Sequence, residues 1–247
     1  MKIITSVHNE HIKHVMNLAK KSYRQEHRQF IIEGTRGYHE LVQLYNPIAV
    51  YITDEYKALH PNTIFDEKIT IILAQHVMNK ISNATTPSGI YAIFTIPAQR
   101  PLPTTGPGII LIDISDPGNM GTLIRTAAAM KIQNVIIIGG IDPYSPKVMQ
   151  STAGCLAAIN LHQTTFKDFI SQHKLQLCAL VVKNGKMPDQ INLRNTFLVV
   201  GSEAHGLSDE QIAACQEKMT IPMPGQAESL NAGVAGSIGL YLMSQQN

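Results

Sequence analysis

The chain has 247 residues, of which 44% are hydrophobic and 15% charged, and a formal net charge of +2. This composition is typical of a globular protein and excludes a disordered or fibrous chain. No apolar run reaches the roughly 18–20 residues of a membrane span, so we expect no membrane partner. The three scattered cysteines form no Cys-x-x-Cys pair. We therefore expect a cytoplasmic protein without a disulfide framework or a bound metal.

The first 28 residues concentrate positive charge. Six Lys and Arg residues stand against two Glu residues, which gives this segment a net charge of +4, and four histidines lie among them. Such a segment can attract a polyanion, or it can be the solvated face of a helix, and charge alone leaves both interpretations open. The absence of Trp and the low aromatic content argue against an aromatic stacking platform.

Residues 1–96 alternate between helical and extended patterns. Residues 10–21 are predicted to form a helix, because Ile12, Val15, Met16 and Ala19 recur at a spacing of three to four. Further helices are expected at 35–45 and 75–81, and strands at 30–32, 48–52, 69–73 and 90–96. Together they predict a small α/β domain.

A break follows between Pro97 and Gly108, where prolines and glycines exclude a helix interior or a central strand. We interpret residues 97–107 as a stiff interdomain linker. From residue 108 to 247 apolar strands alternate with helices, which is typical of a parallel sheet covered on both faces. The strands are expected at 109–114, 134–138, 177–182 and 196–200, and the helices at 120–131, 145–155, 165–173, 208–217 and 229–244.

Three loops in the second half are rich in Gly, Asn, Ser and charged residues, and parallel sheets place their sites at such loops. In the first loop, Pro117 and Gly118 force a turn, Asn119 is suited to cap the next helix, and Arg125 follows within that helix. Taken alone, the asparagine is explained by capping and the arginine by a solvated surface.

The second loop runs from Val200 to Leu207 and contains Glu203 between Gly201 and Gly206, which allow a tight backbone approach. His205 in the same loop is assigned no role.

The third loop, from Ile221 to Asn231, leads into a helix of unusually small residues, a pattern that predicts close packing against another backbone. Ser229 could cap this helix, whereas capping explains Asn231 less easily. None of the three loops is a dinucleotide fingerprint, a phosphate-binding loop, a hydrolase triad or a metal-ligand cluster.

Together the three loops resemble the three motifs of the SpoU branch of the SPOUT RNA methyltransferases. The family patterns are Asn-x-Gly-x-x-x-Arg-Thr-Ala, Gly-x-Glu-x-x-Gly-Leu and Ile-Pro-Met-x-Gly-x-x-x-Ser-Leu-Asn, and they are matched here in order from Asn119, Gly201 and Ile221. The first domain is more weakly similar to the family's substrate-binding domain. Gln150 departs from the basic residue that many relatives have there, which weakens any phosphate contact by its helix.

The resemblance implies an α/β fold with a small N-terminal RNA-binding domain and a C-terminal parallel-sheet domain that contains a trefoil knot. It also implies a homodimer that binds S-adenosylmethionine through Gly201, Ile221 and Leu230. The expected reaction is methylation of a ribose 2′-hydroxyl in RNA, which makes RNA the partner.

The resemblance also suggests roles for five catalytic candidates. Because guanidinium stays protonated in proteins, Arg125 is expected to bind a phosphate and stabilise the developing alkoxide rather than act as a base. Asn119, Ser229 and Asn231 would orient the reactants, and Glu203 would hold its loop or the arginine. The separate first domain favours ribosomal RNA over transfer RNA as the substrate. A catalytically silent RNA-binding protein with the same fold is the alternative from another class.

Overall fold

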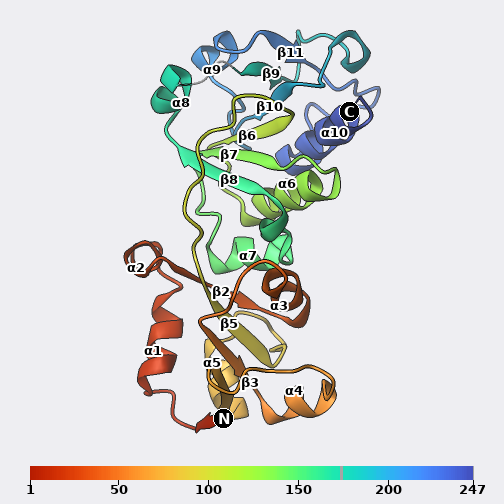
Figure 1. Cartoon of the computed structure of the whole chain (residues 1–247). Coiled ribbons are helices and arrows are strands. Elements are labelled where there is room, and N and C mark those ends of the chain that lie inside the picture. The colour runs from red at the N-terminus through yellow and green to blue at the C-terminus, as the bar shows by residue number, and fades with distance from the viewer. Residues whose placement is uncertain (173–174, 247) are drawn as a thin grey trace. The chain divides into compact units, whose positions relative to one another are not determined.

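The computed structural model describes residues 1–172 and 175–246, and these fall into two compact units. The first unit contains residues 1–97 together with 142–157, and the second contains 98–141 and 158 onwards. No helix in the described part of the chain is long and apolar enough to cross a membrane. Each unit has its own sheet (Figure 1).

The first unit is built on a five-stranded mixed sheet in the order β1-β4-β3-β5-β2. Strand β5 is antiparallel to both β2 and β3, whereas β4 is parallel to β1 and β3. Its elements are β1 (Lys2–Ile4), α1 (Glu10–Asn17), α2 (Lys21–His27), β2 (Gln29–Glu33), α3 (Thr35–Val42), β3 (Ala49–Ile52), α4 (Asp54–Leu59), β4 (Thr70–Leu73), α5 (Gln75–Ile81), β5 (Ile90–Thr95) and α7 (Pro146–Thr152).

Residues 142–157 belong to the first unit although they lie between two strands of the second. Their anchor is an ion pair in which the Arg24 guanidinium donates to Asp142 Oδ2 over 2.6 Å and 3.0 Å. The same guanidinium donates to the carbonyl groups of Leu18 and Ala19, and the arginine is only 2% exposed. The ring of Tyr144 packs on Phe30 at 5.3 Å. Helix α7 therefore packs within the first unit, although the strands before and after it in the chain belong to the second.

The second unit contains an all-parallel sheet in the order β11-β9-β10-β6-β7-β8, as the apolar strand pattern predicts. Its strands are β6 (Gly108–Ile112), β7 (Asn134–Ile138), β8 (Asn160–Thr164), β9 (Gln176–Leu180), β10 (Thr196–Val200) and β11 (Glu217–Met219), and its helices are α6 (Pro117–Ala129), α8 (Phe166–Gln172), α9 (Asp209–Ala213) and α10 (Ala232–Ser244). The central strands β6 and β10 are buried throughout, because helices and loops cover both of their faces.

The proline-rich segment 97–107 does not hang free, because part of it binds strand β8 within the second unit. Gln99 Nε2 donates to the carbonyl of Gln163 over 2.8 Å, Arg100 Nη1 donates to Asn160 Oδ1, and the carbonyl of Arg100 accepts from His162 Nδ1 over 3.1 Å. This part of the segment therefore lies along the edge strand of the sheet.

The small residues of α10 pack against this unit's own helix and sheet. Gly236 faces Leu123 of α6 and Val200 of β10, and a Cβ at this glycine would lie 2.4 Å from the Leu123 side chain. Gly239 similarly faces Leu198 of β10. The helix does pack closely within the chain, but at Gly236 and Gly239 it packs against side chains rather than, as was expected, against another backbone.

Two expectations about elements are wrong in detail. The helix expected at 10–21 ends at Asn17, and a separate helix that was not anticipated, α2, begins at Lys21 after the extended Lys20. Strands β1, β8 and β11 and helix α4 are not anticipated. The helix expected at 165–173 corresponds to α8, with residue 173 outside the described part of the chain. The other predicted elements occur with ends shifted by a few residues.

Candidate functional site

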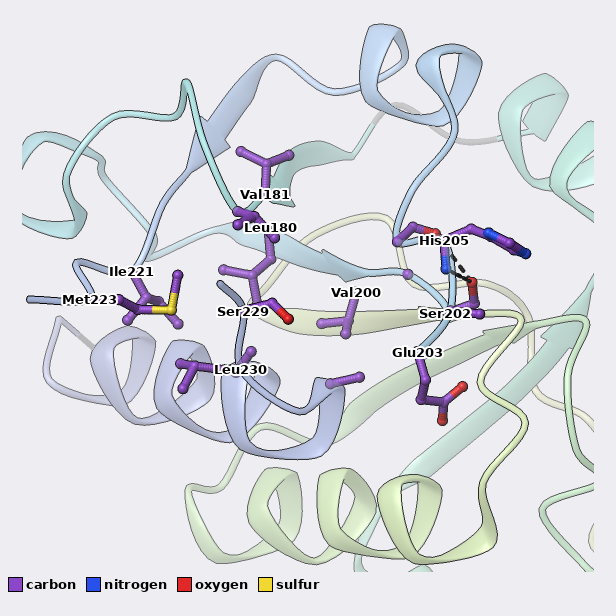
Figure 2. Close-up of a pocket in the computed structure, with 16 residues that line it drawn as sticks. Leu180, Val181, Val200, Ser202, Glu203, His205, Ile221, Met223, Ser229 and Leu230 are labelled. Atoms are coloured by element: carbon purple, nitrogen blue, oxygen red, sulfur yellow. Dashed lines mark hydrogen bonds between the residues drawn. The ribbon is translucent and has the colours of Figure 1, made fainter. Parts of the chain in front are cut away.

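A cavity of about 310 Å³ lies at the carboxyl ends of β9 and β10. Its wall combines residues 180–182 after β9, residues 200–206 after β10, and residues between 221 and 235 that lead into α10. In Figure 2 the side chains of Leu180, Val181, Ile221 and Leu230 gather at one end of the cavity, and Glu203 lies at the other. The volume lies in the usual range for small-molecule sites, and the cavity offers an apolar end and a polar end.

All three residues expected to bind the cofactor line this one cavity: Gly201, Ile221 and Leu230. Gly201 is required by the fold of its own loop, because a Cβ there would lie within 2.3–2.5 Å of backbone atoms of Gly206 and Leu207. The loop closes on itself through hydrogen bonds between Ser202 and Gly206, at 2.9 Å and 3.2 Å. The close backbone contact at Gly201 is therefore made within the loop itself.

The carboxylate of Glu203 joins the second motif loop to the first. Oε2 accepts from the Ser115 backbone N–H at 3.2 Å and its hydroxyl at 3.0 Å, and Oε1 accepts from the Asp116 N–H at 3.2 Å and Asn119 Nδ2 at 3.0 Å. Partial burial raises the pKa of this carboxyl, but the hydrogen bonds from Asn119 and the backbone outweigh that effect and lower the pKa to about 2. Glu203 is therefore ionised at neutral pH and holds the two loops together.

Asn119 is not the cap of α6. Asp116 is the cap, and its carboxylate accepts from the Asn119 backbone N–H over 2.7 Å. The Asn119 side chain is left to bind Glu203, and it is nearly buried. The capping interpretation of this asparagine is wrong, because an earlier residue already supplies the cap.

Asn231 and Ser229 exchange their expected positions. Asn231 caps α10 by accepting from the Val234 N–H over 3.2 Å, whereas Ser229 lies two residues before the cap and lines the cavity. The amide oxygens of Asn231 and Asn119 both approach Gly233, where a Cβ would lie 3.1 Å and 2.9 Å from them. The absence of a side chain at Gly233 therefore lets the two asparagines come close.

Arg125 is on a different side of α6 from the cavity. It lines a shallow hollow of about 260 Å³ with Thr122, Thr126, Ala129 and Met130, and it is exposed. Within the described part of the chain its guanidinium has no hydrogen-bond or ion-pair partner. Of the five catalytic candidates, the structure therefore brings Glu203 and Ser229 to the cavity wall, connects Asn119 to it through Glu203, makes Asn231 a helix cap, and places Arg125 elsewhere.

Sequence reasoning did not name several residues of this site. Leu180 and Val181 line the cavity because β9 ends beside β10, and the rule that sites form at the carboxyl ends of parallel strands could have identified them. Ser115 and Asp116 carried no such signal, because their role depends on a glutamate that is 88 and 87 residues away, respectively. His205, which was assigned no role, is exposed and also lines the cavity (Figure 2).

No group of three or more His, Cys, Asp or Glu side chains among residues 1–172 and 175–246 could hold a metal ion.

Two family profiles match this chain. Residues 107–241 match the SpoU rRNA Methylase family, and residues 9–92 match a domain described as MRM3-like substrate binding domain. Among curated proteins, the chain is 27% identical over 98% of both chains to the 23S rRNA (guanosine(2553)-2′-O)-methyltransferase RlmP of Bacillus subtilis.

Solved structures share the fold over nearly the whole chain. An AdoMet-bound rRNA methyltransferase from Sinorhizobium meliloti has a TM-score of 0.86 and 26% identity, with 99% of this chain and 97% of that chain covered. An RNA methyltransferase of the TrmH family from Porphyromonas gingivalis, described as putative, has a TM-score of 0.82 and 27% identity, covering 95% and 97%.

Proposed function

Because the chain belongs to the SpoU rRNA Methylase family, we propose that it transfers the methyl group of S-adenosylmethionine to a ribose 2′-hydroxyl in RNA, with ribosomal RNA as the substrate. The observation that carries the proposal is the shared cavity wall. Gly201, Ile221 and Leu230 come from two separate motif loops and line the same cavity.

The cavity suits S-adenosylmethionine because its apolar end can enclose an aromatic base and its polar end can receive charged groups. Gly201, Ile221 and Leu230 would hold the cofactor, which when bound supplies an electrophilic methyl group. Glu203 would act as a positioning residue that keeps the first and second motif loops in register. Ser229, whose hydroxyl has no partner among the described residues, is free to orient a reactant.

Arg125 would bind a phosphate of the target nucleotide and stabilise the alkoxide that forms as the 2′-hydroxyl loses its proton. Its free, exposed guanidinium supports this role, because nothing in the described chain competes for it. A lysine cannot reproduce the two-pronged contact of arginine. An Arg125→Lys variant that kept near-full activity with an unchanged pH profile would contradict the role.

Ribosomal RNA is favoured over transfer RNA by one observation. The relative whose name specifies a 23S rRNA methyltransferase aligns over 98% of both chains, so the likeness includes the N-terminal region. We assign substrate RNA binding to residues 1–96, the linker to 97–107 and methyl transfer to 108–247, with a trefoil knot in the last. Transfer RNA remains the alternative substrate.

We further propose that the protein works as a homodimer in the cytoplasm. The exposed apolar side chains on α10, Val234 and Tyr241, support a partner on that face. A second copy is the occupant we infer, because the family resemblance implies a homodimer.

The deciding experiment measures methyl transfer from tritiated S-adenosylmethionine to bulk ribosomal RNA and to bulk transfer RNA, after calorimetry has established cofactor binding. We expect binding and preferential transfer to ribosomal RNA. The modified nucleotide is then located by its resistance to alkaline cleavage, which needs a free 2′-hydroxyl. Cofactor binding without transfer to either RNA would favour a catalytically silent RNA-binding protein.

A further inference from the structure

Helix α2 presents a pair of stacked rings that the methyl-transfer proposal does not use. Tyr23 and His27, one helical turn apart, stack with their centroids 3.9 Å apart and an interplanar angle of 23°. Both rings are half-buried, so part of the stack faces solvent. His14 of α1 approaches both edge-on, at 5.5 Å and 5.3 Å. The absence of Trp argued against an aromatic stacking platform, but this stack is formed by a tyrosine and a histidine.

Hydrogen bonds hold the rings in place before any ligand arrives. His14 Nε2 lies 2.7 Å from Gln29 Oε1, which can only accept, so this nitrogen carries a proton. His14 Nδ1 lies 2.9 Å from the Tyr23 hydroxyl. His27 Nδ1 donates to the carbonyl of Tyr23 over 3.1 Å, and among the described residues its Nε2 has no partner. The stack is therefore preorganised and keeps one free polar atom.

Cations flank the stack on both sides in the sequence. Lys20 and Lys21 begin α2, and Arg28 follows it in a left-handed conformation with φ of 53°; all three are exposed. Arg24 does not add to these exposed cations, because it is buried and paired with Asp142. Glu26 is the one carboxylate of α2. The surface of residues 20–28 thus carries three cations against one anion.

We propose that this surface, made of Tyr23, His27, Lys20, Lys21 and Arg28, binds an unpaired nucleotide of the substrate RNA, with a base on the ring stack and adjacent phosphates on the cations. Aromatic rings interleaved with cations are the chemistry that holds single strands, and a base inside a duplex cannot reach a ring. The proposal rests on the proposed function, because it concerns the same RNA, and it adds a contact in the first unit to the cavity in the second.

The test measures binding of a fluorescent 12-nucleotide single-stranded oligouridylate and of a 12-base-pair RNA duplex to the full chain. Tyr23→Ala should weaken single-strand binding by at least about 5-fold, because stacking contributes ~1–3 kcal/mol per base. Tyr23→Phe keeps the ring but loses the hydrogen bond to His14, so it should bind more tightly than Tyr23→Ala. The double variant Lys20→Gln, Lys21→Gln should flatten the logarithmic salt slope by about 1.4, or about 0.7 for each lost phosphate contact on a single strand.

Two control proteins test whether the charge near α2, rather than the total charge of the chain, determines binding. Glu26→Gln, on the same helix, should tighten binding, because it removes the one anion. The double variant Lys57→Gln, Lys68→Gln removes two exposed cations outside α2 and should leave single-strand binding nearly unchanged. Helix α4, which carries Lys57, lies away from α2 in Figure 1.

The inference fails if Tyr23→Ala and the double variant Lys20→Gln, Lys21→Gln both bind the single strand as the wild type does. It also fails if the duplex binds as well as the single strand and responds equally to Tyr23→Ala, or if the wild type binds neither RNA. Variants of exposed lysines should not perturb folding, so the lysine pair keeps the test decisive should Tyr23→Ala unfold. A wild type that methylates RNA while these variants bind normally overturns this inference and leaves the proposed function standing.

Discussion

Glu203 shows how one residue can be important for a site without reacting. Its four hydrogen bonds all go to residues 115–119, so its carboxylate sets the distance between two loops. Arg125, the other partner expected for it, donates no hydrogen bond to it in the described chain. Glu203 therefore acts as a clamp between the two loops. Its pKa of about 2 reflects how strongly the hydrogen-bond donors favour the ionised carboxylate.

This clamp predicts a pH dependence of stability. The folded-state pKa of Glu203 is lowered from its ordinary value of 4.5 to about 2. The ionised carboxylate therefore contributes stability that is fully present above pH 4.5 and is lost as the pH falls through about 2. Urea unfolding of the wild type and of Glu203→Gln should differ most near pH 6, and the difference should shrink towards pH 3.

Glu228→Gln is the control for that measurement, since Glu228 is exposed in the neighbouring loop and makes no ion pair within the described chain. It should be as stable as the wild type at every pH. A constant difference between the wild type and Glu203→Gln from pH 6 to 3 would contradict the clamp.

The residue scale also shows the limit of the sequence patterns. They identified Asn119, Glu203 and Ser229 as members of one site, because the three motif loops occur in order. They could not say that Asp116 rather than Asn119 caps α6, because both are good caps and lie three residues apart. The choice depends on Glu203, a long-range partner that takes the asparagine's amide.

At the scale of elements, the Arg24–Asp142 pair attaches the segment with α7 to the first unit. The side chains are 3% and 11% exposed, so removing one partner leaves the other charge buried. We expect Arg24→Met to lower the free energy of unfolding by about 3–5 kcal/mol, and a double variant with Asp142→Leu to recover part of the loss. Lys13→Met, which breaks an exposed pair with Glu10 at 3.9 Å, should cost less than about 0.5 kcal/mol. Urea denaturation measures all four proteins, and equal losses for the two single variants would contradict the buried pair.

The proline-rich segment and β8 form a second such attachment, and it should depend on pH. His162 is 2% exposed, and burial, aided by the nearby Arg100 guanidinium and only partly opposed by a hydrogen bond to the Arg100 carbonyl, lowers its pKa below 6.5. Below pH 6.5 the unfolded chain takes up a proton that the folded chain resists, so stability should fall with pH there.

His162→Gln should remove this component. The drop in melting temperature between pH 7.5 and pH 5.5 should be smaller for His162→Gln than for the wild type, and unchanged for His8→Gln, which alters an exposed ring. An identical drop in all three proteins would show that His162 titrates normally.

Elements with strong periodicity could be predicted, and those held by distant partners could not. Strands β7 and β10 lie where their apolar runs place them. Strand β8 could not be predicted because its residues are mostly polar. Its extended conformation depends on its pairing with β7. The division between the units could not be predicted for the same reason, since α7 belongs to the first unit through distant partners such as Arg24 with Asp142 and Phe30 with Tyr144.

At the scale of the whole molecule, the proposed homodimer should depend on the outward side of α10. Val234 and Tyr241 are 48% and 51% exposed and lie seven residues apart, which places them two turns apart on the same side of the helix. A carboxylate on this side would be desolvated in a dimer, at a cost of at least about 3 kcal/mol, or more than a hundredfold in the dimer Kd.

Tyr241→Glu should therefore be monomeric in light scattering at concentrations where the wild type is a dimer. Methyl transfer should fall with it if the partner completes the site around Arg125, whereas Ile64→Glu, at a side chain 96% exposed in the first unit, should change neither property. The comparison separates an interface from a general intolerance of new charge, because both variants add the same carboxylate to an exposed apolar position. A Tyr241→Glu protein that stays dimeric and active would place the partner on another face, and a wild type that is monomeric and fully active would remove the dimer from the proposal.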